Sequence, residues 1–185
     1  FSFFFVVLER GAHVSFANCG LPYFVGGEIT EESKLLVQTP QSLRAALDLD
    51  VRTGSDVIAV DTAAKNVTVR TEDDVYELSY DALVLSPGAS ALRPPLPGLA
   101  SPRVRTLRTV EDAIALRDQV LGGARRAVVL GAGFIGIEAA EALAQQGLDV
   151  SIVELAPHPL PPLETELAWL VTEQLVALGI TVRTG

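Results

Sequence analysis

The sequence contains no methionine and only one cysteine, Cys19, in 185 residues. A single cysteine cannot form a disulfide framework within the chain, which excludes a small disulfide-stapled secreted domain. We therefore expect a reducing compartment and a cytoplasmic protein. In that setting a lone thiol is either a small buried hydrophobe or a reactive group.

Positive charge is also scarce, because 14 Lys and Arg residues face 23 Asp and Glu residues, for a net charge of −9. An acidic surface repels phosphate backbones, so no nucleic-acid partner is expected. No apolar run approaches the roughly 20 residues of a membrane span, and no membrane association is expected. The apolar start, residues 1–8, has no basic leader and is not interpreted as a signal peptide.

Alternation and turn residues predict a chain of mixed α/β type. Strands are expected at residues 6–9, 57–60, 67–70, 75–80 and 81–85, and those between 57 and 80 would form a small β-meander. Residues 31–47 are compatible with a helix broken at Pro40, with Thr39 as N-cap. Thr109 and Asp112 have the spacing of a capping box for a helix that reaches about Leu121.

A β-α-β pattern follows, with a strand at 127–130, a helix at 134–146 and a strand at 149–154. Between the first strand and the helix lies a G-x-G-x-x-G motif, in which Gly131 allows a tight turn and Gly133 lets the backbone approach a pyrophosphate. Gly136 allows close packing of helix and sheet. The motif, including Phe134 and Ile135, is predicted to bind a dinucleotide at the helix N-terminus.

Glu154 ends the second strand of this unit, where a carboxylate can bind an adenosine ribose. A carboxylate repels a 2′-phosphate, so NADH is favoured over NADPH, although the nearby His158 leaves NADPH possible. Leu8-Glu9 repeats the same strand–acid pattern, which suggests a second dinucleotide fold. The alternative is a β-α-β unit that binds no nucleotide.

The segment Ser15 to Gly27, Ser-Phe-Ala-Asn-Cys-Gly-Leu-Pro-Tyr-Phe-Val-Gly-Gly, surrounds the cysteine with small and polar residues typical of an accessible turn. It resembles the active-site segment of coenzyme A-disulfide reductases, in the single-cysteine branch of the pyridine nucleotide-disulfide oxidoreductases. The resemblance extends through Thr39-Pro40, Ser86 to Ala89 and Gly131 to Glu154, and so covers nearly the whole chain.

The resemblance implies roles for particular residues. Cys19 would alternate between a thiolate and a mixed disulfide, and Ser15 and Asn18 would contact coenzyme A near that sulfur. Glu9 would hold the ribose of FAD, and Phe134 would be an aromatic gate at the nicotinamide. Glu138 would lie near the flavin, the alternative being a solvent-facing helix glutamate. The turn that closes the flavin domain would contribute Ser86, Pro87 and Gly88.

The implied architecture is two Rossmann-like three-layer dinucleotide-binding domains, for FAD and NADH, with the small β-meander. Residues 1–95 would be a partial FAD-binding domain, 96–108 a Pro-rich connection and 109–185 a partial NAD(P)H-binding domain. Both domains are expected to be incomplete, because the first flavin glycine motif and the dimerisation domain of the family are not in the sequence. The full-length enzyme is expected to be a homodimer.

The implied activity is reduction of coenzyme A disulfide or persulfide by NADH through FAD and Cys19. A second possibility is an NADH oxidase or peroxidase in which Cys19 cycles through a sulfenic acid. A third is a nucleotide-binding fragment without redox activity. No metal site is expected.

Overall fold

The computed structural model describes residues 4–185 and contains two compact units. The first unit holds the described residues up to Phe16 together with Leu36–Ser90, and the second holds Ala17–Leu35 together with Ala91–Gly185. The second unit thus contains the cysteine segment as well as the β-α-β region. Within residues 4–185, no helix has the length and apolar character needed to cross a bilayer.

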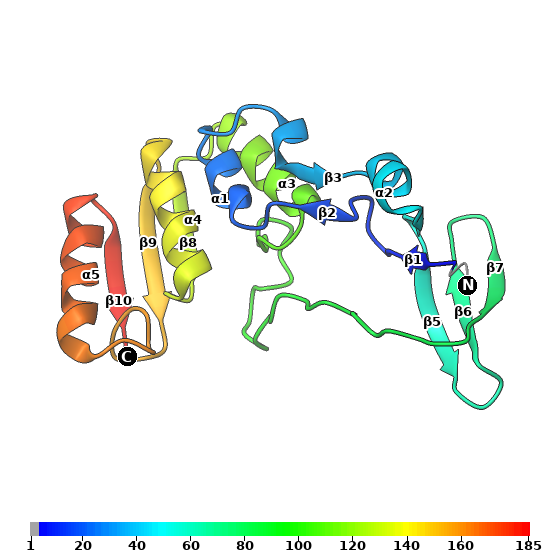
Figure 1. Ribbon diagram of the computed structural model, residues 1–185. Helices are drawn as coiled ribbons and strands as arrows, with labels where there is room; N and C mark the ends of the chain where they lie inside the picture. Colours follow the sequence, from blue (N-terminus) through cyan, green and yellow to red (C-terminus); the bar gives the residue numbers. More distant parts are fainter. Residues whose placement is uncertain (1–3) are drawn as a thin grey trace. The chain divides into compact units, whose positions relative to one another are not determined.

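The second unit contains a three-stranded parallel sheet in the order β10-β9-β8, with the helices α4 and α5 between successive strands (Figure 1). Its elements follow the predicted β-α-β pattern, and the sequence likewise predicts the helix at 164–178 and the strand from 180 that come after it. The elements are β8 Arg126–Leu130, α4 Phe134–Gln145, β9 Asp149–Glu154, α5 Thr165–Ala177 and β10 Thr181–Thr184. The arrangement is that of a parallel α/β fold, which places the loops after β8 and β9 at the same edge of the sheet.

One face of this sheet forms the core of the unit. Val150 and Ile152 of β9 are buried, together with Ala140 and Leu143 of α4. On the neighbouring strand β8, Val128 and Leu130 point to the other face and are exposed. The period-two alternation of the strands therefore decides which side chains the helices cover.

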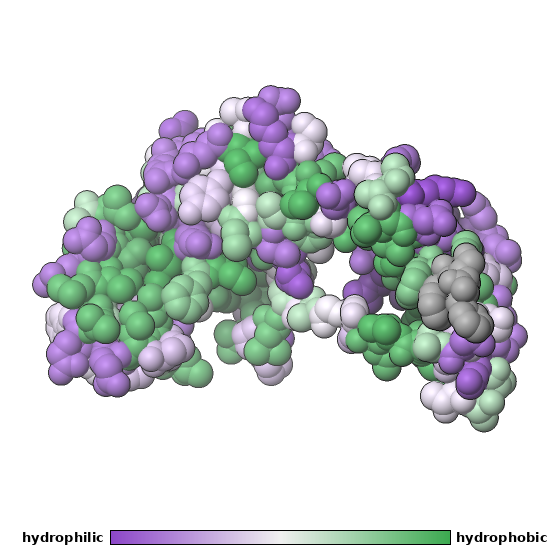
Figure 2. Space-filling view, viewed as in Figure 1, coloured by the Kyte–Doolittle hydropathy of each residue, from purple (hydrophilic) through white to green (hydrophobic). Residues whose placement is uncertain are grey.

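Helix α5 buries a narrower apolar stripe than its sequence suggests. The apolar spacing over residues 164–178 predicts a face of Leu167, Leu170, Val171, Leu175 and Leu178, but of these the structure buries Leu175, together with Ala168. Small Ala168 allows the helix to lie close to the sheet, while Leu167 and Leu170 are exposed. Figure 2 shows hydrophobic residues gathered over the surface that α4, β9 and α5 form. The exposed large apolar and aromatic residues of α5 are Leu167, Trp169, Leu170 and Val176.

The cysteine segment of the second unit packs on helix α3 (Val110–Leu121) through the short helix α1 (Gly20–Val25), which the 3-10 helix η1 (Glu32–Leu35) follows. The capping box predicted for α3 is confirmed, since Thr109 and Asp112 bond each other's backbone N–H groups. Arg117 of α3 lies 4.3 Å from the Phe24 ring and donates to the Ile29 carbonyl at 3.0 Å. A cation over an aromatic face that also bonds a carbonyl holds α1 and its following loop to α3.

The first unit is built from small sheets and one helix. Its strands form a parallel pair, an antiparallel pair and the predicted meander in the order β5-β6-β7. The elements are β1 Val6–Leu8 with β4 Asp50–Arg52, β2 Ser15–Phe16 with β3 Leu36–Gln38, and β5 Asp56–Asp61, β6 Asn66–Arg70 and β7 Val75–Ser79, with helix α2 at Pro40–Leu47.

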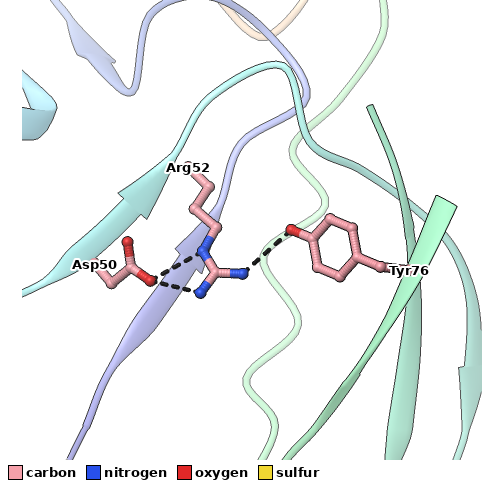
Figure 3. Close-up of polar contacts among 3 residues, drawn as sticks. All are labelled: Asp50, Arg52 and Tyr76. Carbon is pink, nitrogen blue, oxygen red and sulfur yellow. Dashed lines mark hydrogen bonds and ion pairs between the residues drawn. The ribbon is translucent and has the colours of Figure 1, made fainter. Parts of the chain in front are cut away.

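A polar cluster connects β4 with the meander (Figure 3). Arg52 donates to one oxygen of Asp50 from Nε at 2.9 Å and from Nη2 at 2.7 Å, and its Nη1 donates to the Tyr76 hydroxyl at 3.3 Å. These hydrogen bonds raise the pKa of Arg52, and the bonds to Asp50 contribute more than the bond to Tyr76. Arg52 therefore ties the last residue of β4 to β7 of the meander.

Two predictions about the first half of the chain are wrong in detail. Residues 31–47 do not form a helix broken only at Pro40, because Leu36–Gln38 forms β3 and pairs with β2. The helix starts at Pro40 with the predicted Thr39 cap. Residues 81–85 form no strand, since none of the segments described in residues 4–185 pairs with them. A strand needs a hydrogen-bonded neighbour, which local sequence cannot supply.

The α/β class is confirmed. Contacts divide the chain into the two units near residue 90 and place Ala17–Leu35 with the second unit. The expected domains, residues 1–95 and 109–185 with a connection between them, stay a prediction. The assignment of one domain to FAD and one to NAD(P)H stays a prediction.

Burial predicts a large difference in stability between two substitutions in adjacent strands. Ile152→Ala should lower the free energy of unfolding by about 2–5 kcal/mol, because Ile152 is 0% exposed and its truncation leaves a cavity. Val128→Ala is the matched control, since Val128 is 65% exposed and should change stability by roughly 0.5 kcal/mol or less. Urea unfolding of both variants measures this, and equal losses would contradict the description of the core.

Candidate nucleotide and cysteine sites

The glycine loop between β8 and α4 is a tight turn that depends on its first glycine. Gly131 has φ of 97°, in the region where side chains are strained, and its N–H donates to the Val153 carbonyl at 2.8 Å. The next residue, Ala132, is fully buried. The chain thus reverses direction between strand and helix while staying bonded to β9.

The other two glycines of the motif have different surroundings. A Cβ at Gly136 would collide with the Gly131 carbonyl oxygen, so α4 can lie this close to the loop only with glycine there. A Cβ at Gly133 would meet no atom within 4 Å. Gly133 is therefore not required by packing within the protein, and its open side is where an outside group can approach the backbone.

Helix α4 begins directly at this open position. Gly133 is its N-cap and offers no side chain to the first N–H groups. Free N–H groups and the positive end of the helix dipole attract an anion such as a pyrophosphate. Phe134 and Ile135 in the first turn are exposed, with 66% and 60% of their surface accessible. An exposed aromatic ring beside the anion position can contact a bound nucleotide.

Glu154 lies against this loop, as its place after the β-α-β pattern predicts. Its carboxylate accepts a hydrogen bond from the Ala132 N–H at 2.6 Å and another from the Ala156 N–H at 2.8 Å. These bonds, first from Ala156 and then from Ala132, lower the pKa of Glu154. The carboxylate is therefore ionised at neutral pH, and its remaining lone pairs can accept bonds from hydroxyl groups.

The segment after Glu154 contributes residues that the sequence pattern did not single out. Leu160 donates its N–H to the Ala132 carbonyl at 2.9 Å and adopts φ of 49°. Leu160 and Pro159 are buried, while the Nδ1 atom of His158 lies 3.0 Å from the Pro159 carbonyl oxygen. No pattern in the sequence of this segment indicates that it folds back onto the glycine motif.

Glu138 lies one turn into α4 and is half-buried. It lines an open hollow of about 290 Å³ between α1 and α4, together with Pro22, Tyr23, Glu28, Glu141, Ala142 and Gln145. Glu138 is thus neither buried in the core nor a fully solvent-facing glutamate. Its predicted position near a flavin stays a prediction.

Cys19 is exposed and lies immediately before α1. The following residue must be small, because a Cβ at Gly20 would lie 3.0 Å from Leu35 Cδ2 and 3.3 Å from Ile29 Cδ1. The Gly20 N–H donates to the Ala17 carbonyl at 2.9 Å, which closes the turn that carries the cysteine. The thiol is consequently held at the surface on a packed support, as a reacting cysteine requires.

Asn18 is also exposed, and its side chain is held from a distant part of the sequence. Arg108 Nη1 donates to Asn18 Oδ1 at 2.8 Å across a sequence separation of 90 residues. Sequence analysis missed Arg108, because no local pattern marks the residue that an asparagine will contact. Ser15, the other predicted substrate contact, is in β2 of the first unit.

Apart from Glu138, the predicted flavin residues lie in the first unit. Glu9 follows β1 at the carboxyl end of the parallel pair β1-β4, and its carboxylate accepts the Gly11 N–H at 2.6 Å. Ser86, Pro87 and Gly88 are exposed in an extended segment, and Gly88 has φ of 69°. The structure therefore brings Glu154 to the Gly131–Gly136 loop in the second unit, while Glu9 and the segment of Ser86 to Gly88 belong to the first unit.

The chain is similar to known proteins over nearly all of its length. Over 181 residues the chain is 35% identical to a coenzyme A disulfide reductase of Staphylococcus haemolyticus, a match covering 96% of this chain and 40% of that protein. The structure of an NAD-dependent persulfide reductase from A. fulgidus matches with a TM-score of 0.94 and 35% identity, covering 98% of this chain and 35% of that one.

A water-forming NADH oxidase from Lactobacillus brevis, bound to NADH, matches with a TM-score of 0.90 and 29% identity. That match covers 97% of this chain and 40% of the oxidase. The chain thus spans about two fifths of the length of such relatives. The family model for pyridine nucleotide-disulphide oxidoreductases matches residues 4–185. The chain therefore belongs to the pyridine nucleotide-disulphide oxidoreductase family.

Proposed function

We propose that this chain carries the redox cysteine and nucleotide-binding parts of a flavoprotein that uses NADH to reduce coenzyme A disulfide or persulfide. The observation that carries the proposal is the exposed Cys19, held on a packed support in the same unit as the Gly131–Gly136 cradle. A disulfide reductase needs both features, an accessible thiolate and a site for the pyridine nucleotide.

The nucleotide proposed for the cradle is NADH. The open side of Gly133 and the N-terminus of α4 suit the pyrophosphate, and the ionised Glu154 suits the ribose hydroxyls. The negative charge of Glu154 disfavours the 2′-phosphate of NADPH. Phe134, exposed at the first turn of α4, would contact the nicotinamide end, and Ile135 would line the same site.

FAD is proposed for residues 1–95, as part of a flavin domain, and residues 109–185 would be part of an NAD(P)H domain of Rossmann type. Glu9 fits this role, because it follows a strand of a parallel pair, the position where a carboxylate binds a ribose. Ser86, Pro87 and Gly88 would line the flavin, and Glu138 of the second unit would lie near it. When bound, FAD would take a hydride from NADH and supply the two electrons that cleave a mixed disulfide.

Cys19 would perform the step that consumes the substrate. Its thiolate attacks one sulfur of the disulfide, a new sulfur–sulfur bond forms at Cys19, and the other half leaves as a thiolate. Asn18 and Ser15 would contact the substrate near that sulfur. The full-length protein would be a homodimer. It would be cytoplasmic, because a single cysteine fits a reducing compartment.

The second candidate is an NADH oxidase or peroxidase, favoured by the likeness to the water-forming NADH oxidase. In that case Cys19 would cycle through a sulfenic acid instead of a mixed disulfide. Released thiol identifies the reductase, and consumption of oxygen or peroxide identifies the oxidase or peroxidase. A nucleotide-binding fragment without redox activity would show neither.

The chain's only cysteine gives a direct test of the proposed reaction. Incubation with coenzyme A disulfide should add one coenzyme A to the protein, visible by intact mass spectrometry, and Cys19→Ser should abolish the adduct. NADH binding by calorimetry should be the same in both proteins, since Cys19 lies outside the glycine loop. An adduct that persists in Cys19→Ser, or none in the unchanged protein, would contradict the assignment.

Gly133, where a Cβ would meet no atom, and Gly136, where a Cβ would collide, form a matched pair for testing the nucleotide site. Gly133→Ala should leave the free energy of unfolding within about 1 kcal/mol while weakening NADH binding roughly tenfold or more, because its methyl group occupies the pyrophosphate position. Gly136→Ala should cost about 1–3 kcal/mol of stability, because its Cβ collides with the Gly131 carbonyl. Calorimetry with NADH and urea unfolding measure the two effects, and full NADH affinity in Gly133→Ala would contradict the cradle.

The choice between NADH and NADPH should depend on charge next to Glu154. Combining Glu154→Gln with Leu155→Arg removes a negative charge and adds a positive one at a residue that is 92% exposed. The dissociation constant for NADH divided by that for NADPH should rise by roughly tenfold or more, in favour of NADPH. Leu121→Arg, at another exposed leucine, is the charge control and should not change the ratio. An unchanged ratio in the double variant would contradict the role of Glu154.

A further inference from the structure

The hydrogen bond between Arg108 and Asn18 fixes more than the position of the asparagine side chain. Arg108 Nη1 lies 2.8 Å from Asn18 Oδ1. A guanidinium carries only donors and has no acceptor, so the asparagine atom that faces it must be the carbonyl oxygen. The orientation of the Asn18 amide therefore follows from chemistry, and the NH₂ group is left on the other branch of the side chain.

Arg108 is well placed to impose this orientation, because its backbone is held at the start of α3. The Arg108 N–H donates to Asp112 Oδ2 at 2.9 Å, and the same oxygen accepts the Thr106 hydroxyl at 3.0 Å. Farther along α3, Arg117 holds the loop after α1 through the Ile29 carbonyl. Helix α3 thus supports both ends of the segment that contains Cys19.

We propose that Arg108 is a positioning residue that orients the Asn18 amide, so that the NH₂ group of Asn18 faces a ligand bound at Cys19. This inference rests on the proposed function, in which Asn18 contacts the substrate. It adds that the matching substrate is a disulfide whose substituent carries a hydrogen-bond acceptor, such as an amide carbonyl, near the sulfur. A donor held in one orientation favours such a ligand over an apolar one.

Substitutions at the two residues separate orientation from mere contact. Arg108→Lys keeps a group with donors only and should preserve the orientation. Arg108→Glu offers acceptors only, so the Asn18 NH₂ group turns toward residue 108 and the carbonyl faces the ligand. Asn18→Asp keeps an oxygen for Arg108 and removes the NH₂ donor altogether. The last two variants should therefore behave alike, although one changes the residue before the Thr109 cap of α3 and the other changes the cysteine segment.

The measurement compares two disulfides, N,N′-diacetylcystamine, which carries amide groups, and diethyl disulfide, which has no polar group. Mass spectrometry gives the rate at which each forms a mixed disulfide with Cys19 and releases its other half as thiol. A change in the thiolate fraction of Cys19 affects both rates equally, so the ratio of the rates reports the amide contact alone. A merely structural role for Arg108 would not move this ratio.

We expect the rate ratio to fall about fivefold to tenfold in Arg108→Glu and in Asn18→Asp, which is the effect of one lost hydrogen bond. Arg108→Lys should keep the ratio of the unchanged protein. Arg117→Lys is the matched control, because it loosens the same α1–α3 packing without touching Asn18, and it should lower stability with an unchanged ratio.

An unchanged ratio in both Arg108→Glu and Asn18→Asp would overturn the inference while leaving Cys19 as the reacting group. An equal fall in Arg108→Lys and Arg117→Lys would also overturn it, since general loosening would then explain the effect. A Cys19 that forms no mixed disulfide with either compound would overturn the proposed function itself.

Discussion

The approach of Gly136 to the carbonyl of Gly131 is the contact on which the nucleotide site depends. With no Cβ at Gly136, the first turn of α4 can lie against the loop, and only Gly131, Ala132 and Gly133 separate β8 from the helix. The left-handed conformation of Gly131 makes the preceding turn short enough for this. Gly133, which packs against nothing, then becomes the open position of the cradle. Three glycines in one motif thus serve three separate physical requirements.

The carboxylate of Glu154 completes this arrangement from the neighbouring strand. It accepts the N–H of Ala132 inside the glycine loop, so the residue proposed to bind the ribose also orders the loop proposed to bind the phosphates. The Leu160 N–H bonds the carbonyl of the same alanine. Both polar groups of Ala132 are therefore satisfied although the residue is fully buried. Nucleotide binding and local folding share one set of hydrogen bonds.

The cysteine segment is stabilised by different means, through arginines that reach across the sequence. Arg117 and Arg108 of the α3 region contact partners 88 and 90 residues earlier in the chain. Both donate to oxygens, and Arg117 also covers the Phe24 ring. These contacts explain how an exposed thiol can lie on an ordered surface. They also place Cys19 in the compact unit that contains the Gly131–Gly136 loop.

The sequence by itself determined the features that depend on neighbours a few residues apart. Local signals predict the Thr109–Asp112 capping box, the start of α2 after Thr39, the meander strands and the glycine loop with Glu154. Tertiary structure alone decided the features that need a distant partner. Leu36–Gln38 became a strand because β2 pairs with it, residues 81–85 formed none for want of a partner among residues 4–185, and Leu160 folded back onto Ala132. The orientation of Asn18 by Arg108 belongs to the same group, because a hydrogen bond across 90 residues leaves no periodic or local trace in the sequence.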